Sequence, residues 1–96
     1  MLKHVVMFKF RKDIPETDIA EIEGGLSVLP AAIPEIREYV LGRDVVRTER
    51  SYDFALVSSF DNVEAMKRYQ VHPAHQAMVD KIKKACDSIL AVDFEY

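Results

Sequence analysis

Four segments of the chain have the alternating pattern of β-strands, in which successive side chains point to opposite faces. These segments are Leu2–Phe10, Ile36–Val46, Tyr52–Phe60 and Ser88–Tyr96. The polar stretch Arg47–Ser51, between the second and third segments, predicts a hairpin loop. Gly42 interrupts the second segment, where a glycine indicates a β-bulge.

A helix is expected between the first two strands. Its start is marked by Asp13-Ile14-Pro15-Glu16, because proline suits the first turn and acidic side chains favour a helix N-terminus. Gly24-Gly25 weakens this helix, and Pro30 is expected to end or bend it. The apolar stripe of the helix, spaced by three and four residues, consists of Ile19, Ile22, Leu26 and Leu29.

Two further helical segments are expected between the third and fourth strands. The first has Asp61 as its N-cap and runs to about Tyr69. His72-Pro73 ends it, because the residue before a proline avoids helical geometry. Pro73 then begins the second, with His72 as its cap. The apolar stripe of this last helix consists of His75, Met78, Val79, Ile82 and Cys86.

The order β-α-β-β-α-β predicts a ferredoxin-like α+β fold in a single domain, residues 1–96. The helices can cover only one face of a four-stranded sheet. Both faces are nevertheless apolar: in the first strand, Val5 and Met7 lie opposite Val6 and Phe8. Because a bare apolar face is unusual in a monomer, we expect a homodimer in which a second copy covers it. Such an interface buries roughly 2,000 Å² or more.

The composition excludes several classes of protein. Apolar residues make up 49% and charged residues 30% of the chain, which excludes intrinsic disorder. The 13 lysines and arginines are outnumbered by 16 acidic residues, so a nucleic-acid-binding surface is not expected. No apolar run reaches the roughly 20 residues of a membrane helix. A single cysteine, Cys86, and a strand pattern directly after Met1 in place of a signal peptide indicate a cytoplasmic protein.

Two histidines and a tyrosine are the candidates for chemistry. His4 shares a strand face with Val6 and Phe8, so it points under the helices if that face is the covered one. His75 lies in the first turn of a helix and on its apolar stripe, where both the helix N-terminus and burial favour the neutral, basic imidazole. Tyr69 ends the preceding helix, from which its hydroxyl could reach the same space.

Each of these residues also has a purely structural interpretation, as a packed histidine bonded to a backbone carbonyl or as a tyrosine that fills the core. His72 is expected to have a capping or turn role. The three histidines lack the spacing of a metal site. The sequence contains no glycine-rich phosphate loop and no serine-nucleophile motif. Neither a metal nor a cofactor is therefore expected.

The opening His4-Val5-Val6-Met7-Phe8-Lys9-Phe10 and the later Tyr69-Gln70-Val71-His72-Pro73-Ala74-His75 resemble the stress-responsive A/B barrel (Dabb) family. The H-P-x-H motif in the second segment is the more specific signal, and the resemblance extends to Val92-Asp93-Phe94 near the end of the chain. It implies a dimeric α/β barrel, in which two four-stranded sheets pack face to face with the helices outside.

The resembled family includes a polyketide cyclase that closes a linear thioester by an intramolecular aldol condensation without a cofactor. By resemblance to it, His75 would be the catalytic base, Tyr69 would orient it or bind the developing oxyanion, and His4 would hold a polar end of the substrate. Leu26 stands where that cyclase has a tyrosine, and Cys86 lies near the position of a bulky aromatic residue, so a reshaped pocket is expected. The expected pocket residues are Phe8, Leu26, Met78 and Val79.

Three functions remain open. The first is a cofactor-independent lyase or cyclase acting on a small, partly apolar, enolisable carbonyl or polyketide-like compound. The second is a stress-associated structural or small-molecule-binding dimer without turnover. The third, a monooxygenase on the related dimeric barrel, is disfavoured because the chain has no tryptophan. Whether His4, Tyr69 and His75 line one pocket distinguishes the first two.

Overall fold

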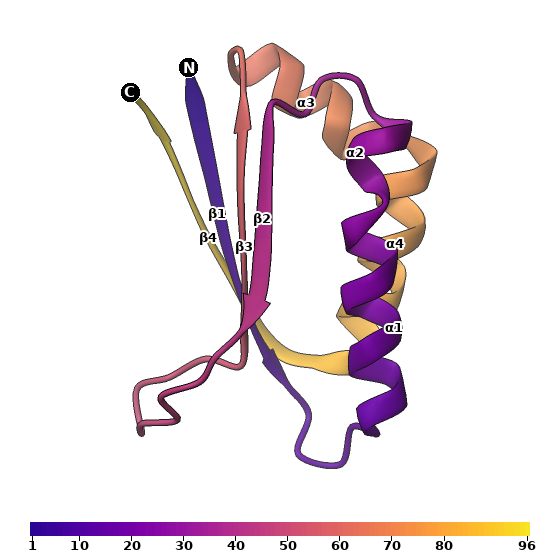
Figure 1. Ribbon diagram of the computed structural model, residues 1–96, viewed down its shortest axis with the longest axis vertical. Helices are drawn as coiled ribbons and strands as arrows, with labels where there is room; N and C mark the ends of the chain where they lie inside the picture. The colour runs from indigo at the N-terminus through magenta and orange to yellow at the C-terminus, as the bar shows by residue number, and fades with distance from the viewer.

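The computed structural model describes residues 1–96 and contains one antiparallel sheet of four strands, in the order β2-β3-β1-β4. The strands are β1 (Leu2–Phe10), β2 (Glu38–Arg43), β3 (Phe54–Phe60) and β4 (Cys86–Glu95). All helices lie on one face of the sheet (Figure 1); they are α1 (Glu16–Ser27), α2 (Leu29–Ala32), α3 (Val63–Val71) and α4 (Pro73–Ala85). This is the predicted ferredoxin-like α+β fold. None of the helices is both long and apolar enough to cross a membrane.

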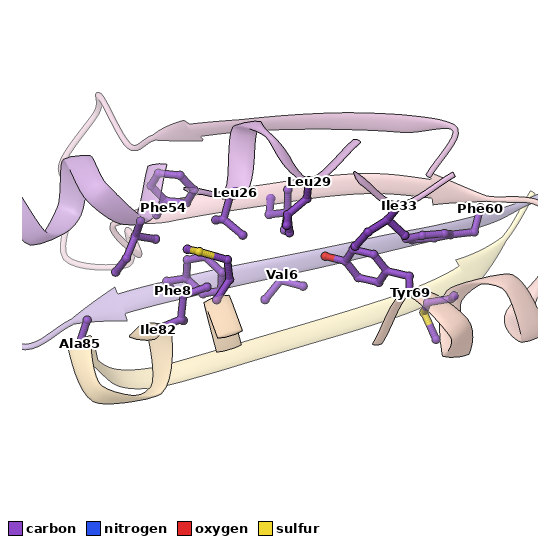
Figure 2. Close-up of a cluster of buried hydrophobic side chains, with 14 of the residues drawn as sticks. Val6, Phe8, Leu26, Leu29, Ile33, Phe54, Phe60, Tyr69, Ile82 and Ala85 are labelled. Carbon is purple, nitrogen blue, oxygen red and sulfur yellow. The ribbon is translucent and has the colours of Figure 1, made fainter. Parts of the chain in front are cut away.

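The hydrophobic core fills the layer between the sheet and the helices. Alternate residues of β1 point into it, and His4, on the same face, is only 7% exposed. The apolar stripe of α1 packs from the other side, with Ile22 and Leu26 almost completely buried. Figure 2 shows Tyr69 in this layer, beside Ile33 and Phe60. The inward face of β1 and the apolar stripe of α1 therefore pack against the same core.

The other face of the sheet has no covering layer in the protomer (Figure 1). Val57, at its centre, pairs with Val5 on one side and Val40 on the other. Val57 therefore lies on the bare face, together with Val5 and Val40. The large apolar side chains left exposed on the sheet include Met7, Val40, Leu90, Val92 and Phe94. The β2–β3 loop projects on this same side, away from the helices (Figure 1).

The predicted strands Ile36–Val46 and Tyr52–Phe60 are too long. β2 has six residues and β3 has seven, and the loop between them occupies residues 44–53 rather than Arg47–Ser51. The predicted bulge at Gly42 is also wrong, because β2 and β3 pair in unbroken register through it. The sheet has its irregularity at the end of β1 instead, between Lys9 and Phe10, where the chain enters β4 directly from α4.

Asp53 explains the early end of the central hairpin. Its carboxylate accepts hydrogen bonds from the Phe10 backbone N–H at 2.8 Å and from the Arg47 guanidinium at 2.7 Å. Arg47 has a φ of 57°, the left-handed conformation that tightens a turn. The backbone of Asp53 still bonds to Asp44 and Phe8, so these side-chain contacts fix the start of the loop directly beyond this last backbone pair.

The first helical stripe is divided as Pro30 predicted, because α1 ends at Ser27 and α2 begins at Leu29. The predicted N-cap of α3, Asp61, is wrong. Asn62 caps the helix by accepting from the Ala65 N–H at 2.9 Å, while Asp61 forms a bidentate ion pair with Arg37. A carboxylate that is engaged by a guanidinium is less available to a helix N-terminus.

The remaining element boundaries differ by one or two residues from the predictions. α3 continues to Val71, beyond Tyr69, and β4 is Cys86–Glu95 rather than Ser88–Tyr96. Cys86 therefore begins a strand and does not belong to the stripe of α4. The cap of α4 is confirmed, since the His72 Nδ1 accepts a hydrogen bond from the Ala74 N–H at 3.1 Å.

Candidate functional site

A cavity of about 160 Å³ lies between the sheet and the helices. Nine of its twelve lining residues are hydrophobic. All seven residues expected at the site line it: His4, Phe8, Leu26, Tyr69, His75, Met78 and Val79. They come from β1, α1, α3 and α4, so the cavity exists only when the helical layer packs on the sheet.

His75 is held in a defined tautomer. Its Nδ1 lies 3.1 Å from the backbone carbonyl oxygen of Gln70, which can only accept, so Nδ1 carries a hydrogen. In the neutral ring the lone pair is therefore on Nε2. Burial lowers the pKa of His75 below its ordinary value, the nearby His4 and His72 act in the same direction, and the Gln70 hydrogen bond opposes them. The neutral imidazole is the form with a free basic nitrogen.

Tyr69 lies between the two histidines. Its ring centroid is 4.2 Å from that of His75 and 6.4 Å from that of His4. The Tyr69 hydroxyl is 2.9 Å from the hydroxyl of Tyr39, on β2. Burial raises the pKa of Tyr69, and the Tyr39 hydrogen bond partly opposes this shift. Either hydroxyl can be the donor in this pair. When Tyr39 donates, the Tyr69 hydrogen is free for another acceptor.

His4 is oriented by a carboxylate. Its Nδ1 hydrogen-bonds to Oδ1 of Asp93, which lies opposite it in the β1–β4 ladder. The His4 side chain is almost fully buried, whereas that of Asp93 is partly exposed at the edge of the sheet. Nδ1 therefore serves as a donor, which leaves Nε2 as the second polar atom of a ring that lines the cavity.

The cavity reaches the surface near the first turns of α4. An outer groove along α3 and α4 shares three residues with the cavity: His75, Val79 and Lys83. A ligand could thus enter past His75. Elsewhere on the surface, hollows near Arg11 and Arg43 are lined mainly by polar and charged residues and contain none of the expected site residues.

Sequence reasoning missed several parts of the site. Asp93 meets His4 because β4 pairs with β1, whereas Tyr39 on β2 meets Tyr69 because α3 packs on the sheet. No local spacing signals either contact. The cavity lining also includes five residues outside the expected set: Val6, Leu56, Ile82, Lys83 and Ile89. Val6 and Ile82 could have been found, because they lie on the same faces as His4 and His75.

The structure contains no cluster of three or more histidine, cysteine, aspartate or glutamate side chains placed to hold a metal ion. The polar lining of the cavity offers two imidazoles, one phenol and one ammonium group instead. That set can accept a proton at a histidine, donate hydrogen bonds to a developing oxyanion, and surround an apolar ligand.

The chain is similar to several known proteins over nearly its whole length. It is 27% identical to olivetolic acid cyclase of Cannabis sativa over 95 residues, which cover 97% of this chain and 94% of that protein. A dimeric ferredoxin-like protein from Thermobifida fusca superimposes with a TM-score of 0.90 at 32% identity, covering 99% of this chain and 90% of that one. A dimeric protein with a ferredoxin-like fold from Bacteroides fragilis superimposes with a TM-score of 0.87 at 31% identity, covering 99% and 95%.

The sequence model of the stress-responsive A/B barrel domain matches residues 2–96. This match includes the β1 segment around His4 and the H-P-x-H segment around His75, both of which contribute to the cavity lining. The chain belongs to the stress-responsive A/B barrel domain (Dabb) family.

Proposed function

We propose that the protein is a cofactor-independent lyase or cyclase that acts on a small, enolisable, polyketide-like carbonyl compound, with His75 as the base. The observation that carries this proposal is the Nδ1–H of His75 bonded to the Gln70 carbonyl, which leaves Nε2 basic in a ring that lines an apolar cavity. The lowered pKa of His75 keeps this nitrogen unprotonated near neutral pH.

The chemistry needs only groups that the chain supplies. His75 Nε2 takes the proton from the carbon next to a substrate carbonyl, and the electrons of that C–H bond form the enolate. The enolate carbon then attacks a second carbonyl of the same molecule, forming a C–C bond. The imidazolium returns its proton to the new alkoxide, so no oxidant or reductant is consumed.

Tyr69 and His4 would stabilise the negative charge that develops on oxygen. The Tyr69 ring packs against the His75 ring, and its hydroxyl is bonded to that of Tyr39. With Tyr39 as the donor in that bond, the Tyr69 hydroxyl is preorganised to donate to an enolate oxygen. His4, oriented by Asp93, would hold the second polar group of the substrate. The relative from Cannabis sativa is a cyclase by name, which supports this assignment.

We also propose that the working form is a homodimer joined through the bare face of the sheet, with the two sheets facing each other. Val57 and the exposed apolar side chains around it form an apolar surface that is unusual in a monomer, and a second copy of the chain would bury it. The relatives from Thermobifida fusca and Bacteroides fragilis are dimeric. In this arrangement the helices, and with them the entrance beside His75, stay on the outside of the dimer.

The test of the activity is a screen of β-polyketide thioesters and other enolisable ketones with the wild type, His75→Gln and Tyr69→Phe. The wild type is expected to exchange α-protons with deuterated water or to cyclise at least one compound class, and His75→Gln to lose this activity by about 10²–10⁴-fold. A folded wild type that binds these compounds and turns over none would instead favour a small-molecule-binding dimer.

A further inference from the structure

The cavity lining contains basic side chains but no acidic ones. Besides nine hydrophobic residues, the lining contains His4, His75 and Lys83, and no acidic residue. Asp93, which bonds His4, lies outside the lining, and Asp80 borders only the outer groove. The single permanently charged side chain at the cavity is therefore a cation.

Lys83 is not neutralised within the chain. Lys81, two residues earlier on α4, pairs with Glu21 at 2.8 Å, whereas no carboxylate oxygen lies within 4.0 Å of the Lys83 ammonium. Lys83 borders both the cavity and the outer groove, so its side chain lies where the apolar interior gives way to water. A cation at such a boundary attracts an anion that also has an apolar part.

The size of the cavity limits the apolar part. Its volume of about 160 Å³ is close to that of an engineered apolar cavity of about 150 Å³ that binds benzene. A ring or short chain of about six carbons therefore fills it, and any longer ligand must extend along the outer groove.

We propose that this cavity binds a compact carboxylate whose apolar part, about the size of a benzene ring, fills the interior while its carboxylate pairs with Lys83. Where it acts as a substrate, the reacting carbonyl lies between these ends, beside His75; this last placement rests on the proposed function. The substrate class is then small keto acids rather than neutral ketones.

Benzoate and benzyl alcohol test the pairing, because both contain the same ring and only benzoate is charged. Their affinities are measured by calorimetry for the wild type, Lys83→Met and Lys84→Met. Lys84 is the matched control, since it borders a different hollow, with Arg11 and Glu21. The wild type is expected to prefer benzoate about fivefold, the effect of one partly exposed ion pair.

Lys83→Met is expected to lose this preference while its affinity for benzyl alcohol stays unchanged, and Lys84→Met to keep it. High salt should weaken benzoate binding and leave benzyl alcohol binding unaffected. A preference that survives in Lys83→Met, or a wild type that binds neither probe, would overturn the inference. Benzoate binding through Lys83 with no turnover of any keto acid would refute the proposed activity but not the carboxylate site. Equal turnover of neutral and acidic ketones would refute the carboxylate site but not the proposed activity.

Discussion

Gly25 on α1 lies so close to Met78 on α4 that a Cβ at position 25 would be 2.5 Å from the Met78 Sδ and 2.8 Å from its Cε. A Cβ at the neighbouring Gly24 would meet nothing within 4 Å. Gly25 thus allows the two helices to approach, and the side chain it accommodates lines the cavity. Both glycines lower the helix propensity of α1, but only Gly25 has a packing role, against Met78.

Gly25→Ala is expected to narrow the cavity. Because the Met78 thioether is flexible, it yields to the new methyl group, and the cavity is the empty space beside it. Benzene binding, followed by NMR shifts of the Met78 methyl group, should weaken several-fold or disappear. The fold should survive, since alanine gains about 0.5–1 kcal/mol of helix propensity over glycine.

Gly24→Ala is the matched control for this change. It brings the same gain in helix propensity without touching Met78, so the free energy of unfolding should rise by about 0.5–1 kcal/mol and benzene binding should not change. If Gly25→Ala binds benzene as well as Gly24→Ala does, Met78 moves elsewhere and the cavity is not limited by this contact.

The Tyr39–Tyr69 hydroxyl pair predicts a non-additive pair of substitutions. Tyr39→Phe or Tyr69→Phe alone leaves the other hydroxyl, buried in Tyr69 and half-buried in Tyr39, without its partner and is expected to lower the free energy of unfolding by about 1–2 kcal/mol. The double variant removes both hydroxyls, so it should be no less stable than either single variant. Urea unfolding of the wild type, the two single variants and the double variant measures the four free energies of unfolding. Losses of stability that add up in the double variant would show that the two hydroxyls do not depend on each other.

The local pattern of the sequence was sufficient to group the site residues by face. Alternation along β1 puts His4 on the same side as Val6, and helical spacing puts His75 on the stripe of Met78; both stripes are buried in the same layer. Hydrophobic burial decides the orientation of α4, because turning the helix over would expose its apolar stripe. Both faces of β1 are apolar, so alternation groups His4 with Val6, but only the packing of the helices on the sheet decides which face is covered.

Contacts between distant segments were not predictable in the same way. Asp93 meets His4 only because β4 pairs with β1 in one register, across 89 positions of the chain. The choice of Asn62 over Asp61 as a cap depends on Arg37, which lies before β2 and binds Asp61 from outside α3. Each of these contacts depends on a side chain that is far away in the sequence, so the pattern of neighbouring residues cannot predict it.

The dimer predicts different effects for two equally exposed valines. Val40, on the bare face of the sheet, and Val71, at the end of α3, are each 66% exposed in the protomer. Val40→Asp would bury an unpaired charge between the two sheets, so it is expected to dissociate the dimer at micromolar concentration. Val71→Asp should remain dimeric. Light scattering of the three proteins decides this, and a monomeric wild type would refute the proposed interface.

The lowered pKa of His75 predicts how stability depends on pH. Between this pKa and the unfolded-state value of about 6.5, the unfolded chain binds more protons at this site than the folded one. The free energy of unfolding therefore rises with pH across this interval and is level, for this group, above about pH 6.5. His75→Gln should remove this contribution, and NMR titration of the imidazole should give a midpoint below 6.5.

Turnover should follow the same ionisation, because only the neutral ring can take a proton. Activity is expected to rise with pH through the His75 pKa and to level off above it, with loss in His75→Gln by about 10²–10⁴-fold. His72→Asn is the matched control: asparagine is a good N-cap for α4, so this variant should stay folded and active. A His75 midpoint above 6.5, or full activity in His75→Gln, would assign the proton transfer to another group in the cavity, with His4 the remaining imidazole.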